Sequence, residues 1–164
     1  MIQCAPVYIF MPLDLCMKKV STARLQTPID LTPSIDLEVQ ESAIQAIQET
    51  LFAAKSPVLF IDGLAKSYHV QESCRVIARK LRIPVYHGTM GKAVVDETEE
   101  YYAGMYQGII SDPYLQEEFE SSDCALIIGA VECDTNSGGF TRKFPVGSIK
   151  IDPYEVSVST HLLN

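Results

Sequence analysis

Short apolar runs alternate with stretches of helical periodicity along most of this chain. Three runs are apolar almost without interruption, at Val58–Ile61, Ile83–Tyr86 and Cys124–Ala130. A strand that is apolar on both faces is covered on both faces, which is typical of parallel sheets. The pattern therefore predicts an α/β fold of three layers (α/β/α), in which helices cover both sides of a parallel sheet.

The helices between these runs are marked by apolar side chains three and four positions apart. Ser56 and Pro57 end the first helix, and Asp112 or its neighbour is expected to be the N-cap of the third, with Pro113 in its first turn. The expected elements are helices at 39–54, 70–81 and 113–121, and a last short strand at 148–152.

The first 36 residues do not share this alternation. Ala5–Leu15 predicts one strand, and residues 18–34 contain two prolines and no helical period. We interpret residues 1–36 as a segment that enters from elsewhere and ends in a linker, and residues 37–164 as one α/β domain.

Composition excludes several classes of function. The 13 basic and 21 acidic residues give a formal net charge of −8, and no basic stripe is present, so nucleic acid is not an expected partner. The apolar runs are far shorter than the roughly 20 residues that span a membrane, and the N-terminus lacks the basic region of a signal peptide. We expect an intracellular, cytoplasmic protein without a membrane partner. The five cysteines include no C-x-x-C pair, which argues against zinc and against a disulfide framework.

Ligands of doubly wound sheets bind beyond the carboxyl ends of the strands, and three loops are expected there. The loop at 62–69 has only Gly63 and lacks the G-x-G-x-x-G fingerprint, so Asp62 could bind a ribose but is more readily explained as a turn residue. The loop at 87–92 has two glycines and Lys92, which could cradle an anion, but the spacing of a P-loop is not met. We interpret it as a structural turn.

The third loop, at 132–140, is rich in Asn, Ser and Gly and predicts a tight, hydrogen-bonded turn. Asp134, Asn136 and Gly138 are the candidates in it for contact with a ligand or an adjoining domain. One acid and one thiol do not predict a metal site.

No catalytic set can be assembled from these residues. The three histidines are scattered, and His87 is interpreted as a hydrogen-bonded residue at a strand end rather than a general base. Tyr101, Tyr102 and Tyr106 are interpreted as packing residues. A hydrolase that uses Cys133 or Ser137 has no supporting motif.

The order of several short motifs is more specific than any one of them. Over nearly the whole chain this order resembles the fungal pyruvate decarboxylases, which are thiamine-diphosphate-dependent enzymes; their indolepyruvate and phenylpyruvate relatives are the alternative. The motifs are Pro6–Leu15, Leu25–Asp30, Ser56–Leu59, Met90–Lys92, Asp96–Glu97, Tyr102–Gly108, Glu120–Asp123, Ile128–Ala130 and Asp134–Phe140.

The resemblance implies a stretch of a longer, homotetrameric enzyme that converts pyruvate to acetaldehyde and carbon dioxide. Residues 1–36 would be the end of the pyrimidine-binding domain and a linker, and residues 37–164 the central domain, with a six-stranded parallel Rossmann-like sheet. Its partners would be the pyrimidine- and diphosphate-binding domains of the same chain. Met1–Leu15 would be a strand without its sheet, prone to pair with another chain.

The catalytic groups of this family belong to the other two domains. They include the residues that hold thiamine diphosphate and Mg²⁺, and the Gly-Asp-Gly motif of the diphosphate site is absent from this sequence. The resemblance therefore assigns no catalytic, cofactor or metal residue here, and the isolated stretch is expected to be inactive. A rival interpretation is a nucleotide-binding module, because central domains of related enzymes hold FAD or ADP.

The resemblance also points to a regulatory loop that contains Asp62, Leu64 and Ser67. In substrate-activated members of the family this loop carries a cysteine and, three positions later, an arginine. Here Leu64 stands at the position of the cysteine and Ser67 at that of the arginine. The thiol and the guanidinium assigned to the activating 2-oxo acid are therefore both replaced.

Overall fold

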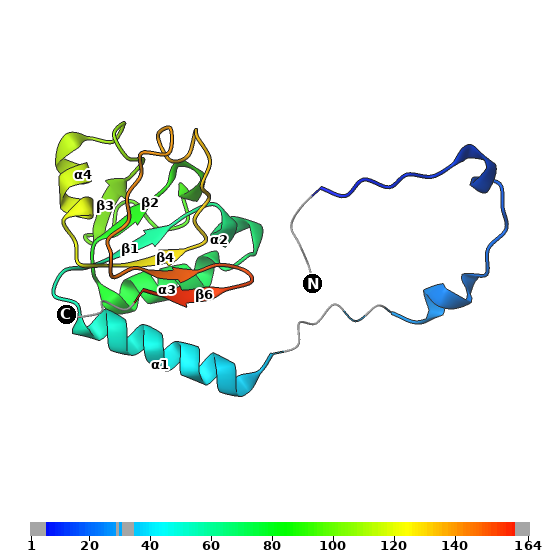
Figure 1. Ribbon diagram of the computed structural model, residues 1–164, viewed down its shortest axis with the longest axis horizontal. Helices are drawn as coiled ribbons and strands as arrows, with labels where there is room; N and C mark the ends of the chain where they lie inside the picture. The colour runs from blue at the N-terminus through cyan, green and yellow to red at the C-terminus, as the bar shows by residue number, and fades with distance from the viewer. Residues whose placement is uncertain (1–5, 29, 31–34, 160–164) are drawn as a thin grey trace. The chain divides into compact units, whose positions relative to one another are not determined.

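The computed structural model describes residues 6–28, 30 and 35–159. The chain divides into two compact units, Met1–Asp36 and Leu37–Asn164 (Figure 1). Among the described residues, no helix combines the length and the apolar character that a membrane crossing requires.

The first unit contains two short 3-10 helices, η1 (Leu13–Leu15) and η2 (Thr22–Gln26). The strand predicted at Ala5–Leu15 is wrong for the described residues 6–15, which form no strand before η1; Ala5 lies outside the described residues. From residue 7 to residue 10 of this segment, every side chain is at least 78% exposed, which is the value for Phe10. An apolar pattern specifies a strand only where a neighbouring strand accepts its backbone hydrogen bonds, and no described residue of the chain does so here.

The second unit is built on one sheet with the strand order β3-β2-β1-β4-β5-β6. Neighbouring strands from β3 to β5 are parallel, whereas β6 runs antiparallel to β5. The predicted α/β fold with six strands is confirmed, and only its last strand departs from a fully parallel sheet. The strands are β1 (Pro57–Ile61), β2 (Val85–His87), β3 (Tyr102–Met105), β4 (Cys124–Ile128), β5 (Ile149–Ile151) and β6 (Val156–Val158).

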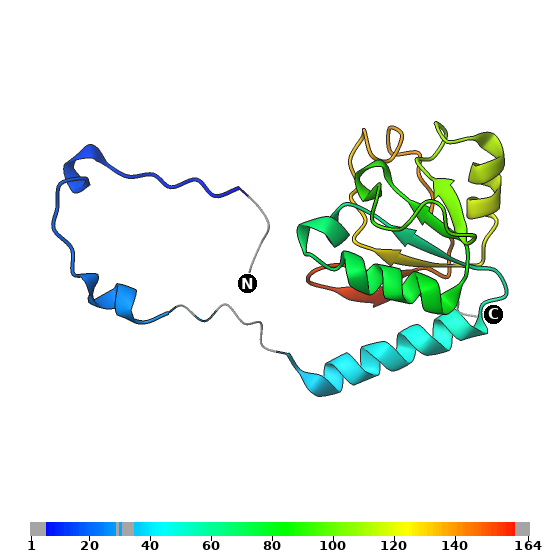
Figure 2. The same ribbon diagram turned by 180° about the vertical axis from the view of Figure 1, so that it is seen from behind.

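Helices cover both faces of the sheet, as Figures 1 and 2 show from opposite sides. Alternate residues of β1 explain this layering: Leu59 and Ile61 pack in one buried cluster with residues of α1 and α3, and Phe60 packs in another with Phe119 of α4. Burying these faces supplies the main stabilisation of the unit. The helices are α1 (Leu37–Ala53), α2 (Leu64–Ser67), α3 (Gln71–Leu81) and α4 (Pro113–Glu120), with a 3-10 helix η3 (Thr89–Gly91).

The N-terminal end of α4 follows from local side-chain chemistry. The Oδ1 atom of Asp112 accepts hydrogen bonds from the backbone N–H groups of Tyr114 (2.9 Å) and Leu115 (3.4 Å), and Pro113 occupies the first turn. The predicted cap is therefore confirmed.

The cysteines Cys74 and Cys124 are small core residues, as the sequence predicted. Burial raises the pKa of the Cys124 thiol to about 11.

Candidate functional site

The carboxyl ends of β1 and β4 meet at the centre of the sheet. The chain places β2 and β3 on one side of β1 and places β4 to β6 on the other, so this is the topological switch point where doubly wound folds bind ligands. The loops predicted to form a ligand crevice follow β1, β2 and β4 and lie at this edge. We call it the carboxyl edge.

Asp62, the residue directly after β1, is fully buried at the carboxyl edge. Its Oδ1 accepts the backbone N–H of Gly63 at 2.9 Å. Its Oδ2 accepts the N–H of Val131 (3.0 Å), the amide of Asn136 (2.6 Å) and the guanidinium of Arg142 (3.3 Å). Three donors therefore converge on Oδ2, and one donor is bound to Oδ1. The acid that could have bound a ribose is thus engaged by its own chain.

Asn136 joins the loop after β4 to the two other loops. Its Oδ1 accepts the N–H of Met90 from the loop after β2 at 3.0 Å, while its Nδ2 contacts Asp62 and donates to the carbonyl oxygen of Val131 at 2.8 Å. Its side chain is 1% exposed and faces this network. Of the candidate residues, Asp62 and Asn136 are brought together by the fold.

Arg142 is the cation of this network and was missed by the sequence analysis. Its Nη2 donates to the carbonyl oxygen of Val131 at 2.9 Å and to Glu132 at 2.7 Å, and its guanidinium lies 4.9 Å from the ring centroid of Phe60. No motif surrounds it in the sequence. The only signal was indirect, because a buried aspartate after β1 requires a donor from elsewhere in the chain.

The glycines of the loop after β2 allow close packing on Asp62. A Cβ atom on Gly88 would lie 2.5 Å from Asp62 Oδ1, and one on Gly91 would collide with the carbonyl oxygen of Ile61. Lys92 extends into solvent and pairs with Glu97 at 2.9 Å, which raises the pKa of Lys92 and lowers that of Glu97. The glycines of this loop therefore allow its backbone to pack closely against Asp62 and Ile61.

The other candidates lie apart from the Asp62 carboxylate. Leu64 and Ser67 belong to α2, where Leu64 is half-buried and Ser67 is exposed. Asp134 is exposed, and its Oδ1 accepts the N–H of Thr135 at 2.7 Å. Gly138 has a φ of +61° and packs on the carbonyl oxygen of Gln107, where a side chain would collide.

His87 ends β2 and is 1% exposed. Its Nδ1 lies 2.8 Å from the carbonyl oxygen of Gly88, which only accepts, so Nδ1 carries the proton. In the neutral ring, Nε2 then accepts from the hydroxyl of Tyr102 at 2.9 Å. The interpretation of His87 as a hydrogen-bonded residue at a strand end is confirmed, and both ring nitrogens are engaged.

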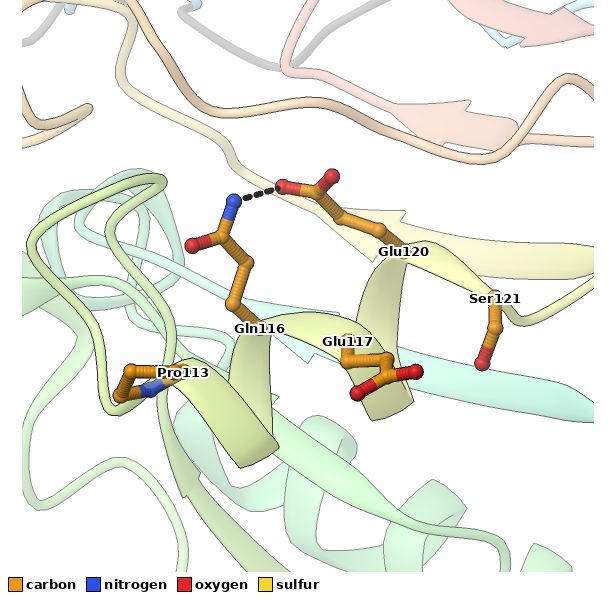
Figure 3. Close-up of a pocket in the computed structure, with 5 residues that line it drawn as sticks. All are labelled: Pro113, Gln116, Glu117, Glu120 and Ser121. Atoms are coloured by element: carbon orange, nitrogen blue, oxygen red, sulfur yellow. Dashed lines mark hydrogen bonds between the residues drawn. The ribbon is translucent and has the colours of Figure 1, made fainter.

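A hollow of about 440 Å³ lies along α4 (Figure 3). Two acids, Glu117 and Glu120, line it, and Glu120 accepts hydrogen bonds from Gln116 and from the hydroxyl of Tyr106, each at 2.8 Å. This arrangement offers no nucleophile with a base. Across the described part of the chain, no three His, Cys, Asp or Glu residues are grouped so that they could hold a metal ion.

The α/β fold agrees with the comparison with protein families. Residues 44–162 match the family described as "Thiamine pyrophosphate enzyme, central domain". The chain belongs to this family.

Curated relatives agree with this assignment. The chain is 38% identical over 139 residues to a pyruvate decarboxylase of Aspergillus terreus, which covers 84% of this chain and 24% of that protein. It is 38% identical over 143 residues to one of Aspergillus fumigatus (87% and 25%) and 34% identical over 146 residues to isozyme 2 of Saccharomyces cerevisiae (88% and 26%). The central-domain chain thus spans about a quarter of the length of these relatives.

Proposed function

We propose that this thiamine pyrophosphate enzyme central domain belongs to a 2-oxo acid decarboxylase, which converts pyruvate to acetaldehyde and carbon dioxide. The observation that carries the proposal is its identity of 34–38% to pyruvate decarboxylases over 84–88% of the chain. Indolepyruvate or phenylpyruvate is the alternative substrate, because the side chain of the 2-oxo acid would be recognised by other domains.

Within that enzyme the domain has a structural and regulatory role. Thiamine diphosphate supplies a carbanion-stabilising ring and Mg²⁺ holds its diphosphate, but the residues at the carboxyl edge do not fit either group. Both carboxylate oxygens of Asp62 accept hydrogen bonds from groups of its own chain, and the basic side chain beside it, Arg142, is buried against it. We therefore assign both cofactors to the pyrimidine- and diphosphate-binding domains of the same chain.

Residues 1–36 are proposed to be the end of the pyrimidine-binding domain and a linker, with the central domain at residues 37–164. The high exposure of the apolar side chains of Val7, Ile9 and Phe10 supports this, since they are suited to pack in the sheet of another domain. We further propose a cytoplasmic homotetramer for the whole enzyme.

The proposed enzyme is not activated through a thiol on α2. Leu64, at the position of the family's cysteine, offers a half-buried aliphatic group, and Ser67 offers a hydroxyl where a guanidinium would hold a carboxylate. In the full-length enzyme, Leu64→Ser should leave the dependence of rate on pyruvate concentration unchanged. A sigmoidal dependence that disappears in this variant would contradict the assignment.

The activity itself is tested with the full-length protein, saturated with thiamine diphosphate and Mg²⁺. Aldehyde formation from pyruvate, indolepyruvate and phenylpyruvate is followed through a coupled alcohol dehydrogenase and the oxidation of NADH. We expect pyruvate to give the highest kcat/KM. A cofactor-loaded protein that decarboxylates none of the three acids would refute the proposed function.

A further inference from the structure

A groove of about 510 Å³ lies between α1 and the edge strand β6, which run beside each other (Figures 1 and 2). Its apolar lining consists of Val39, Ala43 and Ala46 from α1 and of Val156 and Val158 from β6. Val39 is 64% exposed and Val156 is 42% exposed. Open apolar side chains that share one groove indicate a contact surface.

The face of α1 that looks onto this groove is poorly covered. All residues of α1 are described, and Leu51 is the only one that is buried, whereas the shorter α3 buries both Cys74 and Ala78. The groove is lined by α1 over residues 38–46, a stretch of roughly 13 Å at 1.5 Å per residue. That length matches more than two turns of a second helix. In a three-layer fold, helices are the elements that cover such a surface beside a sheet.

The direction of β6 indicates which segment reaches the groove. The strand runs antiparallel to β5, and Val158 pairs with Ile149, the first residue of β5. The strand β6 therefore ends at the edge of the sheet from which the parallel strands begin. The helix α1 ends at this same edge, because only residues 54–56 connect it to β1. The polypeptide that follows β6 thus starts near the C-terminal end of α1 and can return along it in the antiparallel direction.

The charge of α1 argues against a second copy of the same surface as the occupant. Leu37–Ala53 contains Glu38, Glu41 and Glu49 and no Lys, Arg or His. Two copies of α1 packed together would bring like charges close to each other, which disfavours association. A helix that carries basic residues beside its apolar face would instead be attracted to α1.

We propose that the groove is filled by the polypeptide that follows β6 in the full-length protein, folded as a helix antiparallel to α1. Its apolar face packs on Val39, Ala43 and Val156, and its Lys or Arg residues lie near the glutamates of α1. The chain spans 24–26% of three pyruvate decarboxylases, so a longer enzyme has ample polypeptide for this helix. A segment tethered beside the groove also has a high effective concentration there. The inference rests on the proposal that the chain is part of a longer decarboxylase, but not on the substrate of that enzyme.

The test is site-specific photocrosslinking in the full-length protein. Val39→benzoylphenylalanine places the photoreactive group in the groove, and Ile44→benzoylphenylalanine is the control, because Ile44 is 48% exposed on α1 but does not line the groove. Denaturing electrophoresis separates crosslinks within a subunit from crosslinks between subunits, and peptide mass spectrometry identifies the crosslinked segment. From position 39 we expect a crosslink within the subunit to a segment that contains Lys or Arg and lies within about 30 residues after β6. Position 44 should give no crosslink to that segment.

The other outcomes contradict the proposal. A crosslink between subunits would assign the groove to a second copy, and a crosslink to a distant segment would assign it to another domain. No crosslink from position 39, or a crosslinked segment without Lys or Arg, would also overturn it. Because the crosslink is read without substrate, its result is independent of the decarboxylase assay.

Thiol labelling of the same two positions gives a second measurement with smaller substitutions. Val39 is 64% exposed and Ile44 is 48% exposed, so an open groove predicts faster modification of Val39→Cys than of Ile44→Cys. With the groove filled, we expect Val39→Cys in the native full-length protein to react at least about tenfold more slowly than Ile44→Cys, measured by peptide mass spectrometry. An equal or faster reaction of Val39→Cys would overturn the proposal.

Discussion

The buried pair of Asp62 and Arg142 allows one prediction in depth. Both side chains are 0% exposed, and Nη1 of Arg142 lies 3.3 Å from Oδ2 of Asp62. Arg142→Met keeps much of the side-chain volume but removes every donor. The Asp62 carboxylate then retains Gly63, Val131 and Asn136 as donors but loses its counterion.

Removing one partner of a buried ion pair typically costs about 3–5 kcal/mol, because the remaining charge stays buried. Arg142 also donates to Val131 and to Glu132, but Glu132 is 49% exposed and can be hydrated in the variant. We therefore expect Arg142→Met to lower the free energy of unfolding of the chain by about 4 kcal/mol, measured by urea denaturation with circular dichroism.

Asp62→Asn separates charge from shape in the same experiment. The double variant Asp62→Asn with Arg142→Met leaves no buried charge in this pair. Its loss of unfolding free energy should therefore be smaller than the sum of the losses in the two single variants, by at least about 1 kcal/mol. Strict additivity, or a cost of Arg142→Met below about 1 kcal/mol, would refute the view that this pair organises the carboxyl edge.

Three further predictions test packing, charge and cofactor binding. Gly88→Ala should destabilise by about 2–3 kcal/mol, because its Cβ would meet Asp62, and should lower Tm more than Gly139→Ala, where φ is strained but space is open. The N–H groups of Lys55 and its neighbour lower the pKa of Asp123 below 3.8. Because the folded pKa of Asp123 is depressed, the stability that Asp123 contributes is complete above about pH 5 and is lost as pH falls through the folded pKa. Asp123→Asn should therefore reduce the loss of unfolding free energy at acidic pH. An unchanged loss in this variant would contradict the assignment. Calorimetric titration of the chain with thiamine diphosphate and Mg²⁺ together should show no binding, and micromolar affinity would refute the assignment of both cofactors to other domains.

The sequence predicted the elements whose signals are local. The caps and breaks at Pro57 and Asp112 located α1 and α4 to within a few residues, and the continuous apolar runs located β1 and β4. The strands β3 and β6 were missed, because Tyr102–Met105 contains a glycine and Val156–Val158 is only three residues long. Both are edge strands whose pairing is determined by their neighbours in the sheet.

The carboxyl edge shows the same division between local and long-range information. Position after a strand was sufficient to select Asp62, and a loop rich in turn residues was sufficient to select Asn136. That these two side chains meet, 74 positions apart, and that Arg142 joins them depends on the packing of β1 against β4. Sequence spacing contains no trace of such a contact, so the cation could not have been identified in advance.

The linkage of three loops through Asp62 and Asn136 also constrains how the carboxyl edge moves. If one loop moves alone, Asp62 or Asn136 loses hydrogen bonds while the rest of the buried network stays in place, so the free-energy cost of opening that loop includes those hydrogen bonds. Independent fluctuation of a single loop is therefore rare compared with joint opening of all of them. In native-state hydrogen exchange, the amides of Gly63, Met90 and Val131 would behave as one cooperative unit, although they follow three different strands.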